Sequence, residues 1–120
     1  MKVTLRAVLL VTAILCGGSL SASAEDIDPD SARALQVLCS ANQNSSAFST
    51  CIGFLKGIIT MNEYFISLGK PHFIICPKGS MLDAADNYVE FLRSHPEELK
   101  YGQVQSFVDS MRAADPSCNR

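Results

Sequence analysis

The cysteines are the residues of this chain whose number and spacing most directly indicate chemistry. Apart from Cys16 in an apolar N-terminal segment, there are four: Cys39, Cys51, Cys76 and Cys118. A zinc site is the rival use of such a set, but it requires Cys-x-x-Cys pairs or clustered Cys and His, and neither spacing occurs. An even set of cysteines in a small secreted domain instead indicates two disulfides. Cysteines bound in disulfides do not act as nucleophiles.

Neither histidine of the sequence lies where catalysis is the best explanation. His72 follows Pro71 in a connecting segment, and His95 precedes Pro96 at a helix boundary. We expect the first to be exposed and the second to cap or pack a helix end. No serine occupies a Gly-x-Ser-x-Gly nucleophile elbow. The residue types therefore predict a binding protein rather than an enzyme, with no metal and no other cofactor.

The first 24 residues have the pattern of a secretory signal peptide. Lys2 and Arg6 form a basic start, residues 7–15 form an apolar run, and Ala-Ser-Ala at 22–24 is a small-residue cleavage site. The apolar run is shorter than the roughly 20 residues that a membrane-spanning helix needs. An uncleaved anchor and lipidation at Cys16 are the alternatives, and both fit the pattern less well. We expect export to the periplasm and no membrane attachment after cleavage.

The remaining segment, residues 25–120, has the size of one domain. It carries eight Lys and Arg against twelve Asp and Glu, a net charge of −4. This net negative charge does not indicate a nucleic-acid-binding surface, which would carry a clustered excess of Lys and Arg. An oxidising compartment also allows the four remaining cysteines to form the two disulfides that their number indicates.

Apolar residues recur at helical spacing in four segments, and no segment alternates as a strand does. Start and stop signals support these boundaries: Ser80 and Asp83 resemble a capping box, and Gly69 with Pro71 ends the longest segment. The segments are residues 30–39, 47–68, 81–94 and 96–114, approximately. The sequence predicts an all-α bundle of about four helices.

The second predicted helix is the most apolar, and we expect it to lie at the centre of the domain. Gly53 and Gly57 lie one turn apart within it. Each disfavours a helix interior by up to about 1 kcal/mol relative to Ala, and each allows another backbone to approach closely. We expect the two glycines to mediate close packing inside the domain; a homodimer interface is the alternative.

Helix positions favour one of the three possible cysteine pairings. Cys39 ends the first predicted helix and Cys51 lies near the start of the second, so a short loop brings them together. Cys76 precedes the third helix and Cys118 follows the fourth, so they meet if these helices form a hairpin. The predicted disulfides are therefore Cys39–Cys51 and Cys76–Cys118. Chain-entropy arguments give them roughly 3 and 4 kcal/mol of stability, respectively.

Four short motifs follow one another along residues 35–118. They are Cys-Ile-Gly-Phe-Leu-Lys-Gly at 51–57, Ile-Cys-Pro-Lys-Gly at 75–79, Tyr-Val-Glu-Phe-Leu at 88–92 followed by His95-Pro96-Glu97, and Pro-Ser-Cys at 116–118. In this order they resemble the Rap/Tai family of type VI secretion immunity proteins. Two departures from that family's pattern are the added Ser117, where the family closes with Phe-Pro-Cys, and Gly102, which stands where a helix former is usual.

The resemblance implies a small, helical, often dimeric periplasmic protein that binds and inhibits a cognate peptidoglycan amidase effector. The matched residues are structural, so they do not locate the contacts with the amidase. We consider two candidate contact regions. One is the connector Gly69–Phe73, which carries Lys70 and His72, and the other is an acidic helix face formed by Asp83, Asp86 and Glu90.

Two other functions fit the same general features. A periplasmic acid-stress chaperone of the HdeA type is also small, helical, exported and disulfide-bonded. Loss of carboxylate charge at low pH would leave the basic residues unopposed and favour expansion of such a chain. An uncharacterised periplasmic adaptor without a toxin partner is the third reading, which the sequence does not separate from the first.

Overall fold

The computed structural model describes residues 26–71 and 74–119, which form four α-helices and two short 3-10 helices. The elements are α1 (Ala32–Cys39), α2 (Ser46–Ser67), α3 (Met81–Ser94), η1 (Pro96–Lys100), α4 (Gln103–Ala114) and η2 (Pro116–Asn119). This confirms the predicted all-α fold of about four helices. The predicted signal peptide at 1–24 lies outside the described residues, and so do His72 and Phe73. In the described part of the chain, none of the helices has the length and hydropathy needed to span a bilayer.

Serine side chains begin the first three helices. Ser31, Ser45 and Ser80 have extended backbones, and each hydroxyl accepts a hydrogen bond from the backbone N–H three residues later. Such caps satisfy N–H groups that have no partner within the helix. At Ser80 the predicted capping box is complete, because the Asp83 carboxylate also accepts from the Ser80 backbone N–H.

The segment predicted as one fourth helix is divided in two. η1 ends at Lys100, and α4 begins only after Gly102, whose backbone is extended with φ −66° and ψ 153°. The residues at this break form backbone hydrogen bonds with the residues at the start of α1 and just before it. The Ala32 N–H donates to the Tyr101 carbonyl at 2.8 Å, and the Gln103 N–H donates to the Asp30 carbonyl at 3.0 Å. The prediction of one continuous helix is therefore wrong, because these long-range hydrogen bonds use backbone groups that a continuous helix would need.

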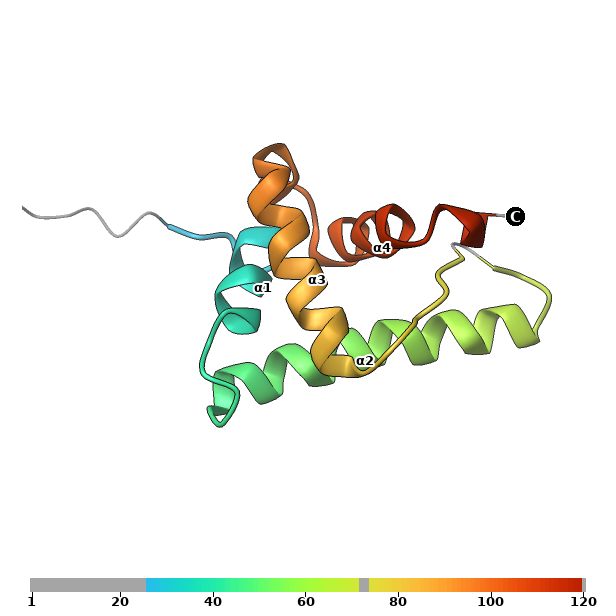
Figure 1. Cartoon of the computed structure of the whole chain (residues 1–120), viewed down its shortest axis with the longest axis horizontal. Coiled ribbons are helices and arrows are strands. Elements are labelled where there is room, and N and C mark those ends of the chain that lie inside the picture. Colours follow the sequence, from blue (N-terminus) through green and yellow to red (C-terminus); the bar gives the residue numbers. More distant parts are fainter. Residues whose placement is uncertain (1–25, 72–73, 120) are drawn as a thin grey trace, which may run out of the picture.

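The short helix α1 holds the central place in the fold. It contacts α2, α3, α4 and η1, and α3 packs in turn against α2 and α4; Figure 1 shows α1 beside α3 and above the N-terminal part of α2. The prediction that α2 lies at the centre is wrong, since α2 buries one face and exposes the other. The fully buried large side chains come from all four helices; they include Leu35, Leu55, Tyr88, Leu92 and Phe107.

Gly53 and Gly57 lie on the exposed face of α2. An added Cβ at either position would have no heavy atom within 4 Å beyond its own helix surroundings. The predicted close packing of these glycines inside the domain is therefore wrong. The core-facing side of α2 is formed instead by larger residues such as Phe48, Leu55 and Ile59.

Both disulfides form with the predicted pairing. Cys39 and Cys51 are bonded with a Cα–Cα distance of 5.1 Å, and Cys76 and Cys118 with a Cα–Cα distance of 5.7 Å. The first ties the end of α1 to the first turns of α2. The second ties the connector that precedes α3 to η2 after α4, so each bond closes one end of a helical pair.

A buried amide holds the connector between α2 and α3 against α2. The Asn62 side chain is only 2% exposed. Its Nδ2 donates to the Ile75 carbonyl at 3.2 Å, and its Oδ1 accepts from the Ile75 N–H at 3.3 Å. The amide thus pairs with both backbone groups of one residue, as a neighbouring strand would, and fixes the position of the adjacent Cys76.

Candidate functional site

Two of the three acidic residues predicted on α3 line a groove. Asp86 and Glu90 lie one helical turn apart, both exposed. They border a groove of about 510 Å³ between α3 and the loop that joins α1 to α2. We call it the acidic groove. Its other lining residues come from α1, the loop, α2 and α3; they are Cys39, Ser40, Ala41, Gln43, Phe48, Asn87, Val89 and Arg93.

The acidic groove has a buried apolar base and polar edges. Cys39 and Phe48 are each 4% exposed and belong to the core, whereas Gln43 and Asn87 are exposed. The Cys39–Cys51 disulfide anchors the loop that forms one wall. A wall held by a covalent bond needs little ordering when a partner binds, which reduces the entropic penalty of association.

The two carboxylates of the acidic groove differ in their pairing. Glu90 forms an ion pair with Arg93 at 2.5 Å, and both side chains are more than half exposed. Among the described residues, the Asp86 side chain forms neither an ion pair nor a hydrogen bond with another side chain or the backbone. Asp86 is therefore the available anion of the groove, and it suits a partner segment with a Lys or Arg side chain.

Asp83 is used within its own turn and does not line the acidic groove. Its Oδ2 accepts from the Ser80 backbone N–H at 2.7 Å and from the Ser80 hydroxyl at 2.8 Å. The Ser80 backbone and side chain hold the pKa of this carboxyl below its ordinary value. Gly79 makes the arrangement possible, because its φ is 76° and a Cβ there would lie 2.7 Å from the Asp83 Oδ2.

The connector that carries Lys70 follows the end of α2 opposite the α1–α2 loop (Figure 1), and the other connector candidate, His72, lies outside the described residues. The helix ends in a Schellman motif: Gly69 has a φ of 65°, its N–H donates to the Ile66 carbonyl, and the Lys70 N–H donates to the Phe65 carbonyl. The Lys70 side chain is exposed. The structure therefore keeps Lys70 apart from Asp86 and Glu90, so the two predicted contact regions remain separate.

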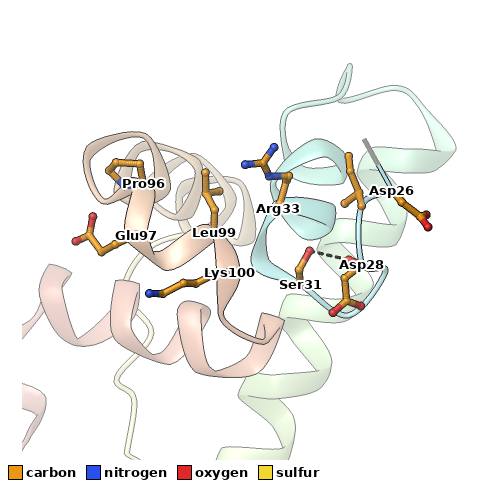
Figure 2. Close-up of a pocket in the computed structure, with 9 residues that line it drawn as sticks. Asp26, Asp28, Ser31, Arg33, Pro96, Glu97, Leu99 and Lys100 are labelled. Atoms are coloured by element: carbon orange, nitrogen blue, oxygen red, sulfur yellow. Dashed lines mark hydrogen bonds between the residues drawn. The ribbon is translucent and has the colours of Figure 1, made fainter. Parts of the chain in front are cut away.

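A second concavity lies between the N-terminal segment, the start of α1 and η1 (Figure 2). It measures about 250 Å³, and its charged lining residues are Asp26, Asp28, Arg33, Glu97 and Lys100. Three acids and two bases around one concavity largely cancel each other's field. This concavity was not predictable from the sequence, because its two walls are more than 60 residues apart along the chain and share no motif. Its mixed charge makes it a weaker candidate than the acidic groove.

The buried polar groups serve the packing of the interior. The Tyr88 hydroxyl lies 2.7 Å from the Ser106 Oγ, and burial raises the pKa of Tyr88 to about 12. Burial, followed by the nearby Asp109 and Glu97 carboxylates, also raises the pKa of Glu98. Across residues 26–71 and 74–119, no three His, Cys, Asp or Glu side chains are grouped so that they could hold a metal ion.

Comparisons with protein-family models, with curated proteins and with solved structures gave no match. A function is therefore inferred from the motifs of the sequence and from the surfaces of the fold. Of these surfaces, the acidic groove combines a fixed shape, an apolar base and an available carboxylate.

Proposed function

We propose that this protein is a periplasmic immunity protein that binds and inhibits a peptidoglycan amidase effector of a type VI secretion system. The observation that carries the proposal is the use of the motif residues in the fold. Cys51 is bonded to Cys39, Cys76 is bonded to Cys118, and Gly79 takes the positive φ that precedes the α3 capping box. The motifs that resemble the Rap/Tai family thus have specific structural roles here.

The acidic groove is the contact surface that we assign to the amidase. A cationic side chain of the enzyme would pair with Asp86, and an apolar neighbour would pack over Phe48 at the base. The Glu90–Arg93 ion pair at the groove edge would orient hydrogen-bonding groups of the partner. Inhibition would follow from covering the substrate cleft of the amidase, because the protein itself performs no chemical step in this mechanism.

The proposal predicts that a peptidoglycan amidase is encoded beside this gene, and that enzyme is the partner to test. Purified oxidised protein should bind that enzyme at micromolar concentration or below and should block its hydrolysis of peptidoglycan. Absence of both binding and inhibition would overturn the proposed function.

Charge-reversal variants locate the contact. We expect Asp86→Lys to weaken amidase binding at least tenfold, since it replaces the available anion with a repelling cation. The matched control is Glu97→Lys, at an acid on η1 that is also exposed and lies outside the acidic groove; it should bind as the unmodified protein does. A Lys70→Glu variant tests the connector. If it weakens binding and Asp86→Lys does not, the contact lies at the connector and the assignment to the groove is wrong.

A further inference from the structure

A carboxylate oxygen of η1 is buried without a partner. The Glu98 side chain is half-buried, and its Oε2 has no hydrogen-bond partner in the part of the chain that the structure describes. An ionised carboxylate that is removed from water without hydrogen bonds is strongly disfavoured, whereas the neutral acid is disfavoured far less. The folded chain therefore favours the protonated form of Glu98.

The acids around Glu98 strengthen this preference. Burial is the largest cause that raises the pKa of Glu98, followed by the negative charges of Asp109 on α4 and Glu97 on η1. His95, at the start of η1, acts in the opposite direction and has the smallest effect of the four causes. Three acids thus meet where η1 approaches α4.

The cations of the surrounding elements do not neutralise Glu98. Each of these elements carries one Lys or Arg; they are Arg33 of α1, Arg93 of α3, Lys100 of η1 and Arg112 of α4. None of the four is among the groups that shift the pKa of Glu98. Arg93 is paired with Glu90, and Arg112 lies 3.9 Å from the Asp109 carboxylate. On α3, the Tyr88 hydroxyl is paired with the Ser106 Oγ.

The chain just after η1 holds the N-terminal segment in place. The Tyr101 carbonyl accepts from the Ala32 N–H at 2.8 Å, and the Gln103 N–H donates to the Asp30 carbonyl at 3.0 Å. The Gln103 Nε2 also donates to the Pro29 carbonyl at 2.6 Å. A displacement of η1 would therefore be transmitted to the residues before α1 through these hydrogen bonds.

We propose that Glu98 makes the contact of η1 with α4 and with residues 26–31 a proton-dependent latch, closed at mildly acidic pH and prone to local opening near neutral pH. Ionisation places an unpartnered charge in the contact, and opening returns that charge to water. Such local opening requires less free energy than global unfolding. The inference does not depend on the proposed amidase partner.

The direction of the pH effect follows from the raised pKa of Glu98 in the folded state. Its contribution to stability is complete below the unfolded pKa of about 4.3 and is lost as the pH rises through the higher folded value. The carboxyls of Asp83 and Asp115 have lowered pKa values, so their contributions change only at lower pH. The latch therefore loosens in a range where those two acids are fully ionised.

Native-state hydrogen exchange tests the latch, because the Ala32 and Gln103 amides form its hydrogen bonds. After correction for intrinsic exchange rates, the opened fraction at these amides should be about threefold to tenfold higher near pH 7.5 than near pH 5, a modest change because water screens a half-buried group. The Ile75 amide, which is bonded to Asn62 at the other end of the domain, is the internal control and should not follow this change. An opened fraction at Ala32 and Gln103 that is the same at both pH values overturns the proposal.

Three neutral variants assign the effect to one residue. Glu98→Gln keeps the shape of the side chain and should remain closed near pH 7.5, with the pH dependence removed. Glu97→Gln is the matched control at the adjacent exposed acid and should keep most of the dependence. Histidine is the side chain that ordinarily titrates in this range, so His95→Gln should also keep it. Full pH dependence in Glu98→Gln, or its loss in His95→Gln, would show that Glu98 is not the proton acceptor of the latch.

Discussion

The two disulfide-bonded ends of the molecule are stabilised in different ways. At the end that contains Cys39–Cys51, the bond lies next to fully or nearly fully buried apolar side chains, including Leu35, Phe48 and Leu55. At the end that contains Cys76–Cys118, Ile75 is the only buried residue among the described residues of the connector. Its position depends on the Asn62 amide, the disulfide and the Lys78–Asp115 ion pair.

The difference shows how a small chain distributes its core. The helices around α1 supply enough apolar surface to bury it, but the connector between Ser67 and Met81 is too short to form a second core. Polar and covalent bonds replace apolar burial there. We therefore expect the connector end to be the more sensitive of the two to loss of a single bond.

Removal of the Cys76–Cys118 bond should have the largest effect. The bond closes a loop with a sequence separation of 42 residues, and the chain-entropy relation gives about 4 kcal/mol of unfolding free energy for that length. Chemical denaturation of a Cys76→Ala/Cys118→Ala variant measures this loss. A loss below that of the other disulfide would contradict the contrast between the two ends.

Removal of the Cys39–Cys51 bond should cost less. Its sequence separation is only 12 residues, which corresponds to about 3 kcal/mol, and the apolar contacts around it remain. The Cys39→Ala/Cys51→Ala variant should keep its helical circular dichroism at 25 °C. It should also weaken amidase binding, because the wall of the acidic groove is no longer anchored.

Asn62→Leu should destabilise the protein by about 2 kcal/mol, since it leaves the buried Ile75 N–H and carbonyl without partners. The local effect is measured by hydrogen exchange, which should show early loss of protection at the Ile75 amide. Asn87→Ala, at an exposed amide on α3, is the matched control and should change the unfolding free energy by less than about 0.5 kcal/mol. Equal effects of the two variants would mean that the hydrogen bonds between the Asn62 side chain and the Ile75 backbone contribute nothing to the unfolding free energy.

The Lys78–Asp115 ion pair should give the smallest effect, and one that depends on pH. The Lys78 ammonium lies 2.8 Å from the Asp115 carboxylate and, together with the Ser117 hydroxyl, holds the pKa of Asp115 below its ordinary value. This contribution is complete above the unfolded pKa of about 3.9 and disappears as the pH falls through the lower folded value. Lys78→Met should therefore be less stable than the unmodified protein at pH 7 and equally stable near pH 2.

The same acid titration examines the chaperone alternative. An HdeA-type chaperone would lose helical structure between about pH 3 and 2 and then protect client proteins from aggregation. We expect the two disulfides to preserve most of the helical signal and client protection to be absent. Client protection at pH 2 would favour the chaperone over the immunity protein.

Local signals made much of the fold predictable. Helical periodicity gave the helices, the Ser80-x-x-Asp83 spacing gave a capping box, and hairpin geometry gave the disulfide pairing. The antiparallel bridge between Ser31, just before α1, and Gly102, just before α4, was not predictable, and neither was the pairing of the Asn62 side chain with the Ile75 backbone. In each case the two segments carry no sequence signal of their contact. The exposure of Gly53 and Gly57 was also missed, since a glycine pair packs equally well inside a domain or between two copies.

The site was less predictable than the fold. Helical spacing placed Asp86 and Glu90 on one face, but the opposite wall of the acidic groove comes from a polar loop without periodicity. Asp83 shares that spacing, yet its carboxylate is used by Ser80. The type and spacing of an acidic residue therefore did not predict whether its carboxylate is free to contact a partner protein.

The two disulfides do not interleave along the chain. The loop from Cys39 to Cys51 is complete before Cys76 begins the next one. A polypeptide that emerges from a membrane pore N-terminus first can therefore close each bond between consecutive cysteines in order of appearance. Under the proposed export, with residues 1–24 removed, joining consecutive cysteines in order of appearance gives the native pairing, so no exchange of disulfide partners is needed to reach it.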